Sequence, residues 1–214
     1  MADRASSDVL TEKDGADASP GAPHSQPSLI LASASPRRRE LLARIGVAPR
    51  AIVAADINET PRPGELPRDY ARRMAREKAL AVEPGGDHVL AGDTVVAVGR
   101  RILPKAETEA EARQCLALLS GRRHRVFSAI AHRSPDRILR EKLSETVVRF
   151  KPLSVHEIDL YITGGEWHGK AGGYAIQGSA EGLIAWIAGS HSGVVGLPLF
   201  ETRALLRSAG FAVG

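Results

Sequence analysis

Three consecutive arginines at 37–39 directly follow the dipeptide Ser35-Pro36. Serine followed by proline is typical of the N-cap and first position of a helix, where the helix dipole disfavours each cation by about 0.3 to 1 kcal/mol. The arginines are unfavourable there unless an anion lies between them and the free helix amides. Guanidinium groups bind phosphate through paired hydrogen bonds. The pattern therefore predicts a phosphate site to which Ser33 and Ser35 add hydroxyl donors; a solvated basic turn is the alternative.

An aspartate, Asp93, lies in the middle of the apolar run from His88 to Val98. Both alternating sets of this run are hydrophobic, as in a central strand buried on both faces. An ionised carboxylate is costly there unless it is paired, hydrogen-bonded or bound to a metal. Near a polyphosphate it would hold Mg²⁺ or act as general base toward water. Alternatively, the strand bends at Gly92 and Asp93 caps a loop. If the carboxylate has no partner, replacing it with asparagine stabilises the protein.

Three lysines near expected helix ends or loops are candidate phosphate partners: Lys78, Lys105 and Lys170. Each can equally be a solvated surface group on so basic a chain. Glu59 stands in a proline-rich loop, where it is a candidate second metal ligand or simply a turn residue.

The segment from Lys170 to Gly178 is rich in glycine. Glycines allow the backbone to approach a ligand closely. Gln177 in this segment has an amide that can both donate and accept hydrogen bonds. The segment is a candidate ligand-binding loop, although the pattern alone also fits an ordinary flexible loop.

Strands and helices alternate in the first half of the chain and an antiparallel hairpin follows, which predicts one α/β domain with a mixed sheet. Capping patterns start two of the helices, at Thr108 with Glu111 and at Ser154 with Glu157. The expected strands are 28–33, 51–55, 88–98, 125–132, 138–150 and 183–187, and the expected helices are 36–45, about 67–82, 108–119, a short one after 154, and about 198–206.

Length and composition fit one soluble domain. The 214 residues are 43% hydrophobic, and no apolar run reaches the roughly 18 residues of a membrane helix. Residues 1–27 lack periodicity and are expected to be a flexible tail before a domain at 28–214. Without an apolar signal segment, we expect a cytoplasmic protein. The single cysteine, Cys115, excludes an intramolecular disulfide and a cysteine-rich zinc site.

The charge of the chain fits an anionic ligand and fits a solvated basic exterior equally well. Residues 1–27 carry five acids and two bases, which leaves 27 bases and 20 acids for the rest, a formal charge of +7. The aromatics are few and are not interleaved with the basic clusters, so we expect no stable nucleic-acid complex. The chain contains no Gly-x-x-x-x-Gly-Lys-[Ser/Thr] loop, no Gly-x-Gly-x-x-Gly fingerprint and no zinc helix of the His-Glu-x-x-His type.

Six motifs together resemble the Maf family over residues 28–210. In chain order they are Leu31-Ala32-Ser33-Ala34-Ser35-Pro36-Arg37-Arg38, Ala75-Arg76-Glu77-Lys78-Ala79, Gly92-Asp93-Thr94-Val95-Val96, Leu118-Leu119-Ser120-Gly121, Lys170-Ala171-Gly172-Gly173-Tyr174-Ala175-Ile176-Gln177-Gly178 and Val194-Val195-Gly196-Leu197-Pro198-Leu199. The sequence departs from the family's usual pattern at residues 103–106 and 127–129. Lys105 is kept within the first departure.

The resemblance implies a fold related to the inosine-triphosphatase superfamily, with the substrate in a cleft between two lobes. It also implies a homodimer and a hydrolase that uses Mg²⁺ or Mn²⁺ to convert surplus or non-canonical nucleoside triphosphates to monophosphate and pyrophosphate. The implied roles are proton acceptor and metal ligand for Asp93, metal ligand for Glu59, catalytic lysines for Lys78 and Lys105, and phosphate binding for Ser33, Arg37 and Arg38.

Substrate choice is implied by three positions. Arg37, Thr94 and Gln177 resemble the branch of the family that cleaves dTTP and UTP, with Lys170 as a further substrate contact. A sister branch that prefers 7-methyl-GTP is the alternative. A non-catalytic nucleotide-binding or nucleic-acid-binding module is an alternative of another class. It explains the basic body but not a carboxylate in a buried strand.

Overall fold

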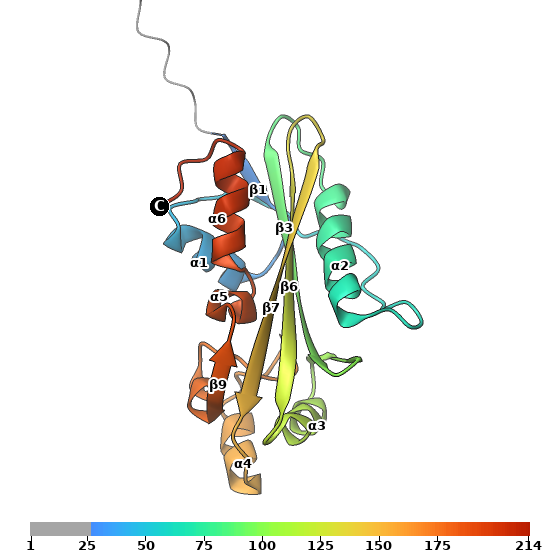
Figure 1. The fold of residues 1–214 in the computed structure, drawn as a ribbon, viewed down its shortest axis with the longest axis vertical. Helices are drawn as coiled ribbons and strands as arrows, with labels where there is room; N and C mark the ends of the chain where they lie inside the picture. Colours follow the sequence, from blue (N-terminus) through green and yellow to red (C-terminus); the bar gives the residue numbers. More distant parts are fainter. Residues whose placement is uncertain (1–26) are drawn as a thin grey trace, which may run out of the picture.

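A long, twisted mixed sheet runs through the computed structural model, which describes residues 27–214 (Figure 1). Its strand order is β2-β1-β3-β6-β7-β9, and β4 pairs with β3. Strand β1 is parallel to β2 and β3, and all other pairs are antiparallel. The strands are β1 Leu29–Leu31, β2 Ala51–Ile52, β3 His88–Val98, β4 Arg101–Leu103, β6 Arg123–Arg133, β7 Leu139–Phe150 and β9 Ile184–Ala188. The predicted α/β fold with a mixed sheet is confirmed, whereas the predicted tail lies outside the described residues apart from Pro27.

The helices divide between the two ends of the sheet (Figure 1). Helices α1 Pro36–Arg44, α2 Pro67–Ala81 and α6 Leu199–Ser208 lie toward the upper end, α3 Glu109–Leu119 and α4 Val155–Thr163 lie at the lower end, and α5 His191–Val195 lies between them. None of the helices in residues 27–214 is long and apolar enough to span a membrane.

Three hydrophobic clusters hold these layers together. Met74 of α2 and Leu42 of α1 belong to separate clusters that include residues of β1 and β3. The third cluster contains Leu116 of α3 and Phe150 of β7, and it occupies the lower part of the molecule. Strands β3 and β6 contribute to all three clusters. They therefore connect an upper part, which contains two clusters, to a lower part, which contains one.

Both predicted capping boxes are present. The Thr108 hydroxyl accepts from the amide of Glu111, and the Ser154 hydroxyl accepts from the amide of Glu157. Ser35 has the predicted N-cap position at α1, but its side chain makes no capping hydrogen bond. The hydroxyl of Ser35 bonds to no residue from 27 to 214 and is available to a ligand there.

Three local features differ from the expectation. The strand predicted at 51–55 is only two residues long, because edge strand β2 pairs solely with the three-residue β1. A two-stranded sheet joins β5 Lys105–Ala106 to β8 Lys170–Ala171, and α5 precedes α6. The sequence has no periodic signal for β5, β8 or α5, because a two-residue strand or a five-residue helix is too short to show one.

Candidate active site

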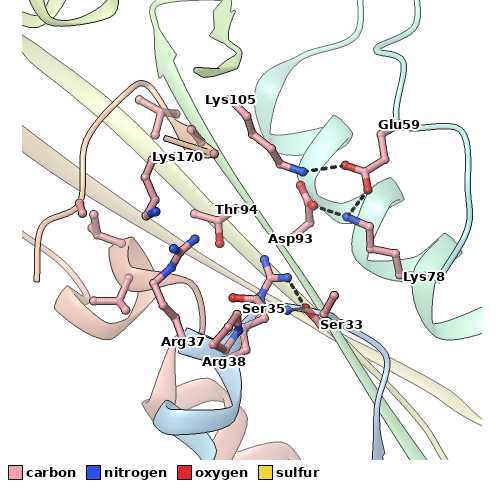
Figure 2. A pocket seen from close by; sticks show the side chains of 18 of the residues that line it. Ser33, Ser35, Arg37, Arg38, Glu59, Lys78, Asp93, Thr94, Lys105 and Lys170 are labelled. Atoms are coloured by element: carbon pink, nitrogen blue, oxygen red, sulfur yellow. Dashed lines mark hydrogen bonds and ion pairs between the residues drawn. The ribbon is translucent and has the colours of Figure 1, made fainter. Parts of the chain in front are cut away.

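A cavity of about 350 Å³ lies where the upper and lower parts meet (Figure 2). The segment from β1 to α1, helix α2 and the loop before it line it from the upper part. Strands β5 and β8 and the loop after β8 line it from the lower part. All eleven site residues expected from the sequence line this cavity: Ser33, Ser35, Arg37, Arg38, Glu59, Lys78, Asp93, Thr94, Lys105, Lys170 and Gln177.

Arg38 is fixed in place by two hydrogen bonds. Its Nη1 donates to the Ser33 hydroxyl over 2.8 Å, and its Nε donates to the carbonyl of Gly196 over 2.9 Å. Gly92 makes room for it, because a Cβ at that position would lie 3.3 Å from Arg38 Nε. Burial lowers the pKa of Arg38, and the charge of Asp93 opposes this effect.

Arg37 differs from Arg38, because it forms no hydrogen bond or ion pair with any residue from 27 to 214. Its side chain extends toward Lys170 (Figure 2). Burial lowers the pKa of Arg37. Burial also lowers the pKa of Lys170, and the positive charge of Arg37 lowers it further. These two neighbouring cations make this side of the cavity strongly attractive to an anion.

Asp93 has a partner. The register of β3 with β6 is unbroken at Asp93, which lies opposite Ala129, and within residues 27–214 its carboxylate bonds to Lys78 and not to a loop. Its Oδ1 lies 2.8 Å from Lys78 Nζ, and the two residues are 6% and 7% exposed. A buried carboxylate needs a partner, and the ammonium group of Lys78 is that partner.

The pair extends into a chain of alternating charges (Figure 2). Lys78 Nζ also lies 3.0 Å from Glu59 Oε1, and Lys105 Nζ lies 3.2 Å from Glu59 Oε2. Burial acts to raise the pKa of Glu59, but the hydrogen bonds and charges of Lys78 and Lys105 outweigh it and the pKa is lowered. Glu59 is therefore a carboxylate at neutral pH.

The loop that carries Glu59 is held by Tyr70. The Tyr70 hydroxyl donates to the backbone carbonyl of Glu59 over 2.6 Å. Burial, together with the charges of Asp93 and Glu59, raises the pKa of Tyr70 to about 12, so the donor is kept.

On the opposite side of the cavity, Thr94 donates to the carbonyl of Gly196 over 3.4 Å. Lys170 Nζ donates to the carbonyl of His168 over 2.9 Å. Gln177 is exposed where it lines the cavity, and its amide bonds to nothing within the described part of the chain. Its donor and acceptor are both available to a ligand.

The donor set for a metal consists of two carboxylates. Within residues 27–214, no group of three or more His, Cys, Asp or Glu side chains is arranged to hold a metal ion. Asp93 and Glu59, however, both contact the same Lys78 ammonium. Mg²⁺ in phosphate-handling sites is usually held by one or two carboxylates, the substrate phosphates and water. The residues present fit such an ion.

Two residues escaped the sequence reasoning as individual site residues, Tyr70 and Tyr174, whereas Ser35 was expected as a hydroxyl donor of the phosphate site. Ser35 and Tyr174 line the main cavity. Tyr70 lines a second, more apolar cavity of about 350 Å³ that shares Asp93 and Glu59 with the first. Aromatic residues at helical or loop positions carry no signal that separates a core role from a site role, and contacts alone place them here.

Comparisons with known proteins agree on one family. The "Maf-like protein" family profile matches residues 28–209. The chain is 69% identical over 189 residues to a "dTTP/UTP pyrophosphatase" of Novosphingobium aromaticivorans, covering 87% of this chain and 94% of that protein. It is 60% identical to a protein of the same name from Zymomonas mobilis, with 87% and 93% covered.

Among solved structures, the Ham1 protein of Staphylococcus aureus is similar over 57% of this chain and 71% of its own, with a TM-score of 0.42 and 17% identity. The family profile spans both the upper and the lower part of the molecule, including every cavity residue described above. Together with the sequence identities, this shows that the chain belongs to the Maf family.

Proposed function

We propose that this protein hydrolyses dTTP and UTP to the monophosphate and pyrophosphate. The observation that carries the proposal is Asp93, a carboxylate on a buried central strand that faces a cavity lined by five cationic side chains. The names of its relatives, at 60% to 69% identity, support the same activity.

The phosphate chain is bound by the side of the cavity formed by the start of α1. Arg37 and the Arg38–Ser33 pair supply donors, and the free amides at the start of this nine-residue helix add to them. This resolves the unfavourable position of the arginines, because a bound polyphosphate places the missing anion between them and the helix dipole.

Lys78 and Lys105 couple substrate binding to the state of the carboxylates. Without substrate, both lysines neutralise Asp93 and Glu59. A bound polyphosphate attracts the same ammonium groups and weakens these pairs. Asp93 then accepts a proton from the attacking water, a contribution typically worth about 10² to 10⁴ in rate.

We also infer that Mg²⁺ or Mn²⁺ is required, with Asp93 and Glu59 as its protein ligands. When bound there, the ion would neutralise negative charge on the phosphates. Loss of turnover in EDTA and its recovery with either metal would support this assignment.

We propose that polar side chains of the same cavity recognise the base. Uracil and thymine present an N–H donor flanked by carbonyl acceptors. The amide of Gln177 can accept a hydrogen bond from the N–H group and donate one to a carbonyl. Thr94 also lines the cavity, and Arg37 lies beside Lys170 in it (Figure 2). We propose that these three residues favour dTTP and UTP over purine triphosphates.

Membership of the family also supports a homodimer that acts in the cytoplasm. Light scattering coupled to size-exclusion chromatography measures the mass directly, and a mass near 46 kDa, about twice the 22.8 kDa chain, is expected.

A panel of triphosphates tests the function. With Mg²⁺, dTTP and UTP are expected to be turned over faster than dATP, GTP and 7-methyl-GTP, and ion-exchange chromatography should show monophosphate and no diphosphate. Preference for 7-methyl-GTP would move the protein to the sister branch. Strongly salt-dependent binding of long nucleic acid without turnover would favour a binding module instead.

A further inference from the structure

The glycine-rich loop of residues 170–178 provides much of the lower wall of the cavity. Lys170, Tyr174, Ala175 and Gln177 all line the cavity. Regular structure holds only the start of the loop, at β8, and the 3₁₀ helix Ser179–Leu183 follows it. The amide of Gly172 donates to the carbonyl of Pro104 over 3.0 Å, and the placement of Gln177 further along the loop also depends on side-chain contacts with the core.

One of these contacts is a buried hydrogen bond to His124 at the start of β6. The Tyr174 hydroxyl lies 2.8 Å from His124 Nε2, and the two residues are 5% and 2% exposed. Phe150 packs against both rings, edge-on to Tyr174 with centroids 5.1 Å apart. Burial lowers the pKa of His124 to about 4, so its ring is neutral at pH 7.

The rest of the loop is also packed closely against the core. The amide of Ala175 donates to the Tyr161 hydroxyl over 3.0 Å. A Cβ on Gly172 would lie 2.8 Å from Val96, and one on Gly173 would lie 3.2 Å from the backbone of Ala112. These contacts lie directly before and after Tyr174, so the bond between Tyr174 and His124 is one of a set that together fix this part of the loop.

We propose that His124 is a positioning residue for substrate binding, which acts through Tyr174 to fix the cavity-facing residues of the 170–178 loop. His124 does not line the cavity, and its effect reaches the substrate only through the loop. This inference rests on the proposed triphosphate hydrolysis and adds to it a positioning residue near the start of β6.

His124→Phe tests the proposal, because phenylalanine keeps an aromatic ring of similar size but cannot bond to Tyr174. A buried hydroxyl without a partner is unfavourable, so the loop should spend less time in the arrangement that binds substrate. KM for dTTP is expected to rise about tenfold. The value of kcat should change less than twofold, since Asp93 and Lys78 belong to β3 and α2. His124→Gln, which retains an acceptor, should recover part of the loss.

His132 provides a matched control on the same strand. It is 0% exposed, bonds to another histidine (His88, 2.9 Å) and does not line the cavity. His132→Phe should lower thermal stability, as His124→Phe does, but it should leave KM and the preference for dTTP over GTP unchanged. A purely structural role for His124 would make the two variants behave alike.

Tyr174→Phe breaks the same bond from the other side and carries the test if His124→Phe does not fold. Both single variants should raise KM, and the double variant should be no worse than the worse single variant, because one bond is lost in all three. The proposal would be overturned by a wild-type KM in His124→Phe, by an equal rise of KM in His132→Phe, or by effects that multiply in the double variant.

Binding of the α,β-methylene analogue of dTTP, measured in parallel, should weaken by the same factors. If the wild type binds this analogue but does not hydrolyse dTTP, the proposed function fails while the binding series still decides the role of His124.

Discussion

Replacing Asp93 with asparagine removes the proposed base while keeping nearly the same shape. The asparagine amide does not accept a proton at neutral pH, so hydrolysis of dTTP should fall by at least about 10²-fold. Binding of the substrate should persist, because Arg37, Arg38 and Ser33 are untouched. The loss is therefore expected in kcat rather than in KM.

The same substitution should destabilise the protein. The sequence alone left open an unpaired carboxylate, whose removal would stabilise the fold, but the structure pairs Asp93 with Lys78 at 2.8 Å. Removing one partner of a buried ion pair costs about 3 to 5 kcal/mol. Here Lys78 keeps Glu59 at 3.0 Å, and asparagine still offers an oxygen, so the expected cost is about 1 to 3 kcal/mol. For a domain of this size, that lowers Tm by roughly 2 to 12 °C.

Asp159→Asn is the matched control. Asp159 pairs with Arg113 at the surface, where the two side chains are 47% and 42% exposed, and it does not line the cavity. Such pairs contribute about 0 to 1 kcal/mol, so turnover and Tm should remain close to those of the wild type. Turnover assays and thermal melts of both variants decide the matter. Near-wild-type hydrolysis by Asp93→Asn would refute the assignment of the base, and a raised Tm would refute the importance of the pair with Lys78.

Four further results are expected. Lys78→Met should lower the urea midpoint of unfolding more than Asp93→Asn does, because it leaves the carboxylates of Asp93 and Glu59 without their shared cation. Gln177→Glu replaces an amide donor with an acceptor, so it should reduce kcat/KM for dTTP and UTP about 5- to 150-fold and reduce that for a purine triphosphate less; an equal loss for all substrates would contradict base reading. Burial lowers the pKa of His124 and of His132 to about 4, below the unfolded value of about 6.5. The free energy of unfolding, measured in urea, should therefore be at its full value above about pH 6.5 and should fall by about 3 kcal/mol per histidine as the pH falls toward 4. Deleting residues 1–27 should leave Tm and turnover nearly unchanged, as their composition predicts, and a large loss of either would show that they contribute to the domain.

Local signals in the sequence were sufficient for the elements that hold the phosphate side and the buried carboxylate. The apolar run at 88–98 predicted β3 with its observed bounds, and the two capping boxes predicted the starts of α3 and α4. These succeed because each signal depends on residues within one or two turns or on one strand. The position of Asp93 within a buried strand was informative for the same reason.

Long-range contacts were not predictable in this way. The sequence marked Lys78, Glu59 and Lys105 only as separate candidates, and the short pairing of β5 with β8 that brings Lys105 near Lys170 has no local pattern. His124 was one of seven scattered histidines. Its contact with Tyr174, 50 residues away, depends on how β6 and the 170–178 loop meet in the lower core.

Hydrolysis of dTTP in water enriched with ¹⁸O tests the central claim most directly, because it reports both the bond that breaks and the atom that water attacks. If Asp93 directs water to the α-phosphorus, mass spectrometry should find one ¹⁸O in dTMP and none in pyrophosphate, and Asp93→Asn should lose this product. Formation of dTDP and labelled orthophosphate, or of pyrophosphate that carries the label, would contradict the account.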